Sequence, residues 1–294
     1  MHASVKAALG LAAVGAACVA YGAGYEVRSF RLRRRDVPVL PSGQPPLRVL
    51  HLSDMHVTPK QAKKKAWVAS LRALEPDAVI VTGDFLADVH AVPHALDALA
   101  PLMELPGAFV LGSNDYYAPR PLNPARYLSG PSGLEPNREM LNWGELVAGL
   151  TEAGWVDLSN ARGELKADGR LIELRGVDDP HIGRDRYEAV AGAYNSDADL
   201  TLGVTHAPYL RVLNGFAADG TDLILAGHTH GGQLCIPGLP ALVTNCDIDR
   251  KRAKGLHHHD DSWLHVSAGL GTSPYAPIRF DCPPEATLLT LTPS

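Results

Sequence analysis

Residues 47–84 read LRVLHLSDMHVTPKQAKKKAWVASLRALEPDAVIVTGD. The stretch opens on the apolar run 47–52, which predicts a buried strand, and ends with a second apolar run at 78–81. Between them, residues 62–74 carry apolar side chains at helical spacing. Two buried strands joined by a helix predict a βαβ unit, in which parallel strands lie beside each other and the helix covers one face.

The same alternation continues along the chain. A helix is expected at 91–103, a strand at 108–111 and a further helix at 144–153. The Pro-, Gly- and Asn-rich residues 118–138 predict a long loop. Six more strands are expected at 164–166, 171–177, 200–204, 223–226, 263–267 and 286–291. No linker divides the chain after residue 47, so residues 47–294 are predicted to form one α/β domain with a parallel sheet flanked by helices.

Carboxylate, amide or imidazole side chains follow five of the predicted strands. They occur in Ser53-Asp54-Met55-His56, Thr82-Gly83-Asp84, Gly112-Ser113-Asn114-Asp115, Thr205-His206 and Gly227-His228-Thr229-His230. Each motif alone is also typical of an ordinary turn or strand cap. Ligands bind at the carboxyl ends of strands in open α/β sheets, so the recurrence favours a site. Imidazole and carboxylate without thiolate suit zinc, iron or manganese, and Asp84 could bridge two such ions.

The order of these motifs resembles that of the calcineurin-like metallophosphoesterase superfamily, whose pattern runs D-x-H, G-D, G-N-H-D/E, H and G-H-x-H. The resemblance covers roughly residues 46–292. It implies a two-sheet β-sandwich flanked by helices, a four-layer α-β-β-α fold. It also implies an enzyme that hydrolyses phosphoesters with two divalent metal ions, manganese, iron or zinc.

The resemblance also implies which residues hold the metals. Asp54, His56 and His230 would hold the first ion, His206 and His228 the second, and Asp84 would bridge them.

One motif departs from the family pattern, because residues 112–115 read Gly-Ser-Asn-Asp. Without a gap, Ser113 falls on the family's asparagine ligand and Asn114 on its catalytic histidine. With a slip of one residue, Asn114 becomes the metal ligand. We prefer Asn114, since an amide oxygen is the better neutral donor. In either register the histidine that assists the leaving group is absent, which leaves the catalytic residue unknown.

Two longer features resemble one branch of the superfamily. These are residues 227–233, Gly-His-Thr-His-Gly-Gly-Gln, and residues 277–280, Pro-Ile-Arg-Phe. The branch contains bacterial membrane-associated phosphoesterases, some of which hydrolyse a UDP-diacylglucosamine lipid precursor. It implies phosphodiester or lipid-linked pyrophosphate substrates. Two alternatives stay open: a metal-binding regulatory module with little turnover, which the missing histidine motivates, and a structural membrane protein with an incidental metal site.

The N-terminal region has a different composition. Residues 7–24 form an uncharged run of 18 residues, just long enough to span a bilayer as a helix. The run is interpreted as a single-pass membrane anchor at 1–24, a cleaved signal peptide or a helix buried in the fold. Residues 25–46 predict a basic connector or an edge strand. The connector carries Arg28, Arg31, Arg33, Arg34 and Arg35, against Lys6 alone before the run, which predicts a cytoplasmic catalytic domain.

Composition excludes several other functions. The net charge of −5 provides no basic footprint for nucleic acid. Cysteines occur at 18, 235, 246 and 282, without the spacing of a disulfide framework or a zinc–thiolate site. Three other motifs have ordinary explanations: His257–His259 as a solvated loop, residues 178–181 as a turn that could touch the site, and residues 269–271 as a turn.

Overall fold

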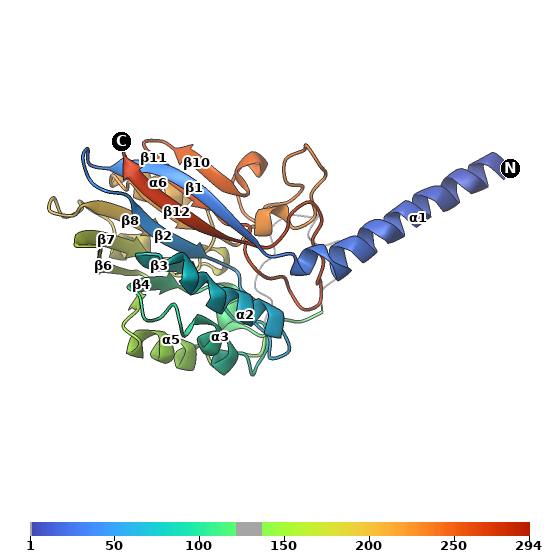
Figure 1. Cartoon of the computed structure of the whole chain (residues 1–294), viewed down its shortest axis with the longest axis horizontal. Coiled ribbons are helices and arrows are strands. Elements are labelled where there is room, and N and C mark those ends of the chain that lie inside the picture. Colours follow the sequence, from blue (N-terminus) through green and yellow to red (C-terminus); the bar gives the residue numbers. More distant parts are fainter. Residues whose placement is uncertain (1, 122–136) are drawn as a thin grey trace.

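The computed structural model describes residues 2–121 and 137–294. Two mixed sheets pack face to face, and helices cover both outer faces (Figure 1). In the described part of the chain each sheet has six strands, in the orders β1-β12-β2-β3-β4-β5 and β10-β11-β9-β8-β7-β6. The two-sheet sandwich that the resemblance implied is therefore confirmed.

The first sheet consists of β1 (Arg31–Leu40), β12 (Glu285–Pro293), β2 (Leu47–Leu52), β3 (Ala78–Thr82), β4 (Gly107–Val110) and β5 (Val156–Asp157). The second consists of β10 (Gly255–His259), β11 (Ser262–Val266), β9 (Leu223–Ala226), β8 (Leu200–Val204), β7 (Arg170–Gly176) and β6 (Ala161–Ala167). The α-helices are α1 (His2–Gly24), α2 (Ala62–Ser70), α3 (Val92–Leu99), α4 (Ser113–Tyr116), α5 (Trp143–Glu152) and α6 (Leu210–Ala218).

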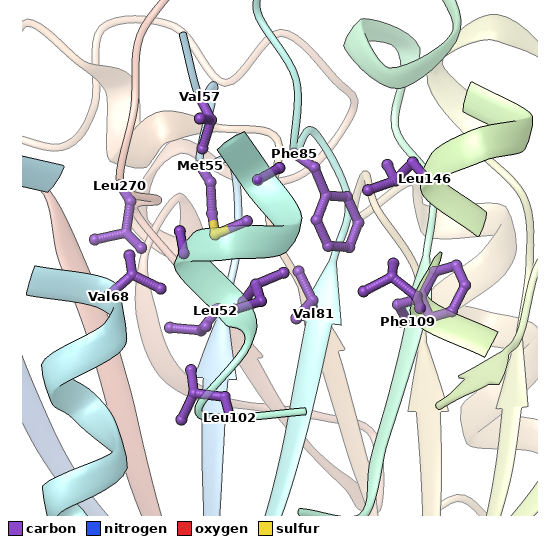
Figure 2. Close-up of a cluster of buried hydrophobic side chains, with 14 of the residues drawn as sticks. Leu52, Met55, Val57, Val68, Val81, Phe85, Leu102, Phe109, Leu146 and Leu270 are labelled. Atoms are coloured by element: carbon purple, nitrogen blue, oxygen red, sulfur yellow. The ribbon is translucent and has the colours of Figure 1, made fainter. Parts of the chain in front are cut away.

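Alternate side chains of the central strands enter different cores. Val49 and Ile80 pack between the two sheets, whereas Leu50 and Val81 pack beneath α2, α3 and α5. Successive side chains of a strand point to opposite faces, so strands that are buried on both faces must be apolar at every position. This requirement explains the uninterrupted apolar runs of the sequence. Figure 2 shows the core beneath the helices of the first sheet.

Both sheets contain a block of parallel strands. Strands β2, β3, β4 and β5 pair in parallel in the first sheet, and β7, β8, β9 and β11 do so in the second. The segments that follow β2 and β3 contact those that follow β8 and β9. The carboxyl ends of both parallel blocks therefore meet at one edge of the sandwich, where all five motifs lie.

Several elements differ from the prediction. The helix expected at 62–74 ends as a 3₁₀ turn over Leu71–Leu74. The solvated loop predicted for His257–His259 is wrong, because these residues form the edge strand β10, which pairs antiparallel with β11. The imidazole of His259 is buried and hydrogen-bonds to Asn214. These polar residues therefore belong to a paired strand and not to a solvated loop. Residues 122–136 of the expected loop lie outside the described residues.

The N-terminal region consists of α1 and β1. Helix α1 projects away from the sandwich (Figure 1), and the segment Lys6–Arg28 is long and apolar enough to cross a membrane. An 18-residue stretch of this segment has a mean hydropathy of 1.7 and only 6% of its residues buried. The interpretation as a helix buried in the fold is therefore wrong. The basic stretch that follows forms the edge strand β1, which pairs in parallel with β12.

Candidate metal centre

Four side chains from three loops converge at the shared edge of the sheets. Potential ligand atoms of Asp54, His56, Asp84 and His230 all lie within 4.8 Å of one another. The Nε2 atom of His56 is 3.3 Å from Nε2 of His230 and 3.4 Å from Oδ2 of Asp84. Oδ1 of Asp54 is 3.5 Å from Nε2 of His230. Two imidazoles and two carboxylates around one point form a donor set that suits a divalent transition metal.

A second set of side chains meets the same oxygen of Asp84. Oδ2 of Asp84 accepts a hydrogen bond from Nδ2 of Asn114 at 2.8 Å and lies 3.5 Å from Nε2 of His206. The ring of His228 lies 5.2 Å from that of His206, measured between centroids. Asp84 thus stands between the two sets, which is the position that a bridging carboxylate needs.

The backbone around these side chains is strained. Asp54, His56, Asp84, His228 and His230 all have φ between 42° and 69°, in the left-handed region that non-glycine residues seldom adopt. Each such residue costs on the order of 1–3 kcal/mol and persists only where the surrounding structure enforces it. Five of them at one edge are typical of a functional site.

Buried side chains hold the strained loops in place. In the sequence, Met55 lies between Asp54 and His56, and Phe85 follows Asp84. The side chains of Met55 and Phe85 both point into the core beneath the helices (Figure 2). Close approach also requires glycine at two positions. A Cβ atom at Gly112 would lie 2.3 Å from Oδ1 of Asp84, and one at Gly227 would lie 1.8 Å from Oγ of Ser53.

Asp115 supports the loop that carries Asp84. Its carboxylate is fully buried and accepts hydrogen bonds from the backbone N–H groups of Gly112, Asp84, Phe85 and Leu86. Burial and the neighbouring Asp84 raise the pKa of this carboxyl to about 8, although the four N–H donors favour its ionised form. These donors occupy both of its oxygens. Asp115 therefore positions Asp84 and is poorly placed to donate a proton to a substrate.

A buried chain of hydrogen bonds leads to Asp54 from between the sheets. The imidazoles of His265 and His51 contact each other at 2.8 Å, and His51 hydrogen-bonds to Thr82 at 3.0 Å. Thr82 donates to Ser53, which donates to Oδ2 of Asp54. Partners of this kind orient metal ligands. Sequence reasoning missed them, and the available signal was a histidine at an inward-facing position of an apolar strand.

Burial sets the charge states of the histidines. It lowers the pKa of His56 to about 4 and holds the pKa values of His228 and His230 well below the usual range. Neutral imidazole is the form that binds metals. The pair of Asp84 and His206 behaves differently. Although burial opposes both charges, mutual attraction holds the pKa of Asp84 well below normal and that of His206 well above it.

The side chains of the centre have spare ligand atoms. Nδ1 of His206 contacts the carbonyl of Thr82 at 2.6 Å and Nδ1 of His230 contacts that of Gly271 at 3.0 Å, so in both rings Nε2 faces the centre. Oδ1 of Asp54 and Nε2 of His206 are buried without a hydrogen-bond partner among the described residues. Buried polar atoms normally have partners, and divalent ions would supply them here. The residues present therefore fit a metal centre.

Comparison with known proteins identifies the family. Residues 47–232 match the family model for calcineurin-like phosphoesterase. The chain belongs to this family. As a family member it is a metal-dependent phosphoesterase, and the buried group of Asp54, His56, Asp84 and His230 is a metal-binding group that suits that chemistry.

Curated relatives agree with this assignment. The phosphodiesterase YaeI of Escherichia coli is 28% identical over 89% of this chain and 88% of its own length. The metallophosphoesterase YkoQ of Bacillus subtilis is 27% identical over 82% of each chain. A bovine transmembrane protein with a metallophosphoesterase domain is 27% identical over 87% of this chain and 56% of its own. Among solved structures, the calcineurin-like phosphoesterase YfkN of Bacillus subtilis covers 75% of this chain and 88% of its own at 12% identity, with a TM-score of 0.36.

Arg279 is a further residue of this phosphoesterase that sequence reasoning did not assign to the site. Its guanidinium is fully buried and donates to the carbonyls of Ala268 at 2.8 Å and Gly271 at 2.7 Å. The same Nη2 atom lies 3.2 Å from Nδ1 of His230. Arg279 therefore fixes the segment that orients the His230 ring.

The segment 178–181 forms a turn and also touches the site. Pro180–Ile182 is a 3₁₀ turn, and the ring of His181 lies 4.3 Å from that of His228, measured between centroids. Nδ1 of His181 is 3.1 Å from the hydroxyl of Tyr209. Burial and the neighbouring His206 lower the pKa of His181 to about 4, so its ring is neutral at pH 7.

The contacts at Asn114 predict the outcome of a ligand test. We expect Asn114→Ala to lower occupancy of the second metal position more than Ser113→Ala does, because the Asn114 amide reaches Asp84 whereas Ser113 begins helix α4. Metal content per chain, measured by mass spectrometry after dialysis, checks this. Loss of metal in Ser113→Ala with retention in Asn114→Ala would establish the ungapped register instead.

Proposed function

We propose that this phosphoesterase hydrolyses phosphodiesters or lipid-linked pyrophosphates at a membrane surface, with two divalent metal ions. The observation that carries the proposal is the position of Asp84, whose Oδ2 lies within 3.5 Å of side-chain atoms from three other strand-end loops. The residues proposed to hold the metals are Asp54, His56, Asp84, Asn114, His206, His228 and His230.

The chain's own residues prepare the site for an anionic substrate. When bound, the metals would lower the pKa of the attacking water and neutralise charge on the phosphate. The protein keeps most imidazoles neutral, holds Asp84 ionised, and keeps the three loops after β2, β3 and β9 in a strained backbone conformation. Pre-set ligand geometry of this kind avoids reorganisation during the reaction.

Two observations support the choice of substrate class. The relative YaeI, which shares 28% identity over most of both chains, is named as a phosphodiesterase. Helix α1 is long and apolar enough to hold the domain at a membrane, where lipid-linked substrates reside. The remaining alternative is a metal-binding regulatory module, which the absence of the family histidine in residues 112–115 favours.

A substrate panel tests the proposal. The full chain, loaded with manganese, zinc or iron, is assayed on a phosphomonoester, on bis(p-nitrophenyl) phosphate and on a nucleotide-linked lipid. We expect turnover of the diester and the lipid, and complete loss of turnover after chelation. Metal binding without turnover of any member of the panel would establish the regulatory alternative, and full turnover after chelation would refute the metal mechanism.

The arginine distribution predicts the orientation of the domain. Five arginines between residues 28 and 35 follow the apolar run and only Lys6 precedes it, so we expect the domain on the cytoplasmic side. Protease added to intact cells should leave the domain undigested, and the same protease should digest it after lysis. Digestion in intact cells would reverse the orientation and indicate an exported enzyme.

A further inference from the structure

An apolar loop stands beside the metal centre and plays no part in it. Residues Leu234–Leu242, here called the apolar loop, read LCIPGLPAL and contain no charged side chain. Four of its side chains are exposed: Leu234, Ile236, Leu239 and Leu242 at 41–59%. Outside α1 and Tyr25, these are four of the seven large apolar side chains exposed in the described part of the chain. Soluble proteins seldom expose several large apolar side chains together unless a partner covers them.

The apolar loop lies against the end of α1 that joins the domain. A groove of about 350 Å³ lies between them. It is lined by Cys18 and Val19 of α1, by residues of the apolar loop, and by Ile278 and Phe280. The loop begins directly after the His230–Gly232 turn, which carries a candidate metal ligand. The groove is therefore continuous with the apolar surface of α1, and the apolar loop that lines it follows the turn that carries His230.

Contacts fix the angle between α1 and the domain. The carboxylate of Glu26 is buried and accepts hydrogen bonds from the backbone N–H groups of Asp281 and Cys282 at 3.1 and 2.6 Å. Gly22 packs so closely that a Cβ atom there would lie 2.5 Å from the carbonyl oxygen of Arg279. The rings of Tyr21 and Phe280 meet edge to face. These contacts therefore hold the domain at one angle to α1.

The candidate span then decides where the apolar loop lies. Val19 belongs to Lys6–Arg28, the segment that is long and apolar enough to cross a membrane, and its side chain is 56% exposed. Val19 lines the groove together with Leu234, Ile236 and Leu242 of the apolar loop. If α1 spans the bilayer, the level of Val19 lies in hydrocarbon, and the apolar loop beside it lies there too. Tyr25 and Arg28 then lie at the headgroups, where aromatic and basic side chains are favoured.

We infer that the apolar loop is a second membrane contact, in which Leu234, Ile236, Leu239 and Leu242 enter the acyl-chain region of the leaflet beside α1. This inference rests on the proposed membrane anchorage by α1. The exposed Arg28 follows α1 directly, and the exposed Arg31 opens strand β1, so both basic side chains lie near the end of the span and suit an anionic leaflet. The loop that carries His230 would then face the bilayer at a fixed height.

Depth-dependent fluorescence quenching tests the inference on the full chain in vesicles of phosphatidylglycerol and phosphatidylcholine. Leu239→Trp reports on the loop, and Ser42→Trp is the matched control in the exposed turn at the far end of β1. Val14→Trp reports on α1 itself. The emission of the four native tryptophans is subtracted with the unmodified chain. Circular dichroism checks that each variant is folded.

We expect phosphatidylcholine brominated near the headgroup end of its chains to remove most of the added emission of Leu239→Trp and little of that of Ser42→Trp. Quenching of Val14→Trp with Leu239→Trp as unquenched as the control would overturn the inference and leave the anchor intact. If Val14→Trp is unquenched too, the anchor and the inference both fail. Hydrolysis by the unmodified chain in the same vesicles reports separately on the proposed activity.

Discussion

Asp84→Ala is expected to reduce turnover of bis(p-nitrophenyl) phosphate by roughly 10³-fold or more, since metal ions stabilise such transition states by several kcal/mol and each 1.4 kcal/mol is a factor of ten. The reason is positional. Oδ2 of Asp84 lies between the two donor sets, 3.4 Å from His56 and 3.5 Å from His206. Removing this carboxylate therefore disturbs both metal positions, whereas loss of any other candidate ligand disturbs one.

The measurement combines kinetics with metal content. Asp88→Ala is the control, because Asp88 lies on the same loop and its carboxylate caps the N–H of His90 away from the metal-binding group. We expect the control to retain wild-type turnover and two metals per chain. Asp84→Ala also leaves the N–H of Asn114 without its acceptor, so Asp84→Asn serves as a second variant of similar shape. A chain that lacks the carboxylate, binds two metals and turns over normally would refute the bridging role.

The second large effect is expected in how strongly the rate of hydrolysis depends on the leaving group. A protonated histidine near the leaving oxygen contributes roughly 10² to 10⁴ in rate as a general acid, and this phosphoesterase has no histidine in residues 112–115. His181 lies beside His228, but its pKa of about 4 leaves it neutral at pH 7. Asp115 is occupied by four backbone N–H donors. The leaving group must therefore depart with little protonation, and p-nitrophenyl esters should react far faster than alkyl esters.

A series of aryl and alkyl phosphodiesters measures this dependence. We expect the logarithm of kcat/KM to fall steeply as the pKa of the leaving alcohol rises. A flat dependence would mean that another acid replaces the histidine. His181→Ala and Asp115→Asn would then be tested first, because His181 lies beside His228 and burial raises the pKa of Asp115 to about 8. The variant that restores a steep dependence would identify that acid.

Local sequence determined the secondary structure of the central strands well. Apolar runs such as 47–52 and 78–81 are buried on both faces, and continuous burial leaves a continuous apolar pattern. Strand β10 was not predicted, because backbone hydrogen bonds hold this edge strand and its polar side chains form no apolar pattern. The short β5 was missed for a related reason, since two residues provide no measurable period.

The sequence by itself determined the family of this phosphoesterase and which residue types could bind metal, because ligand chemistry belongs to side chains and their order is printed in the chain. Only the tertiary structure decided how those residues meet. Asp54 and His228 are far apart in sequence and belong to different sheets, yet the carboxylate of Asp54 accepts the N–H of His228. The His265–His51 contact, the buried Arg279 and the groove between α1 and the apolar loop likewise depend on packing between distant segments, which no local pattern encodes.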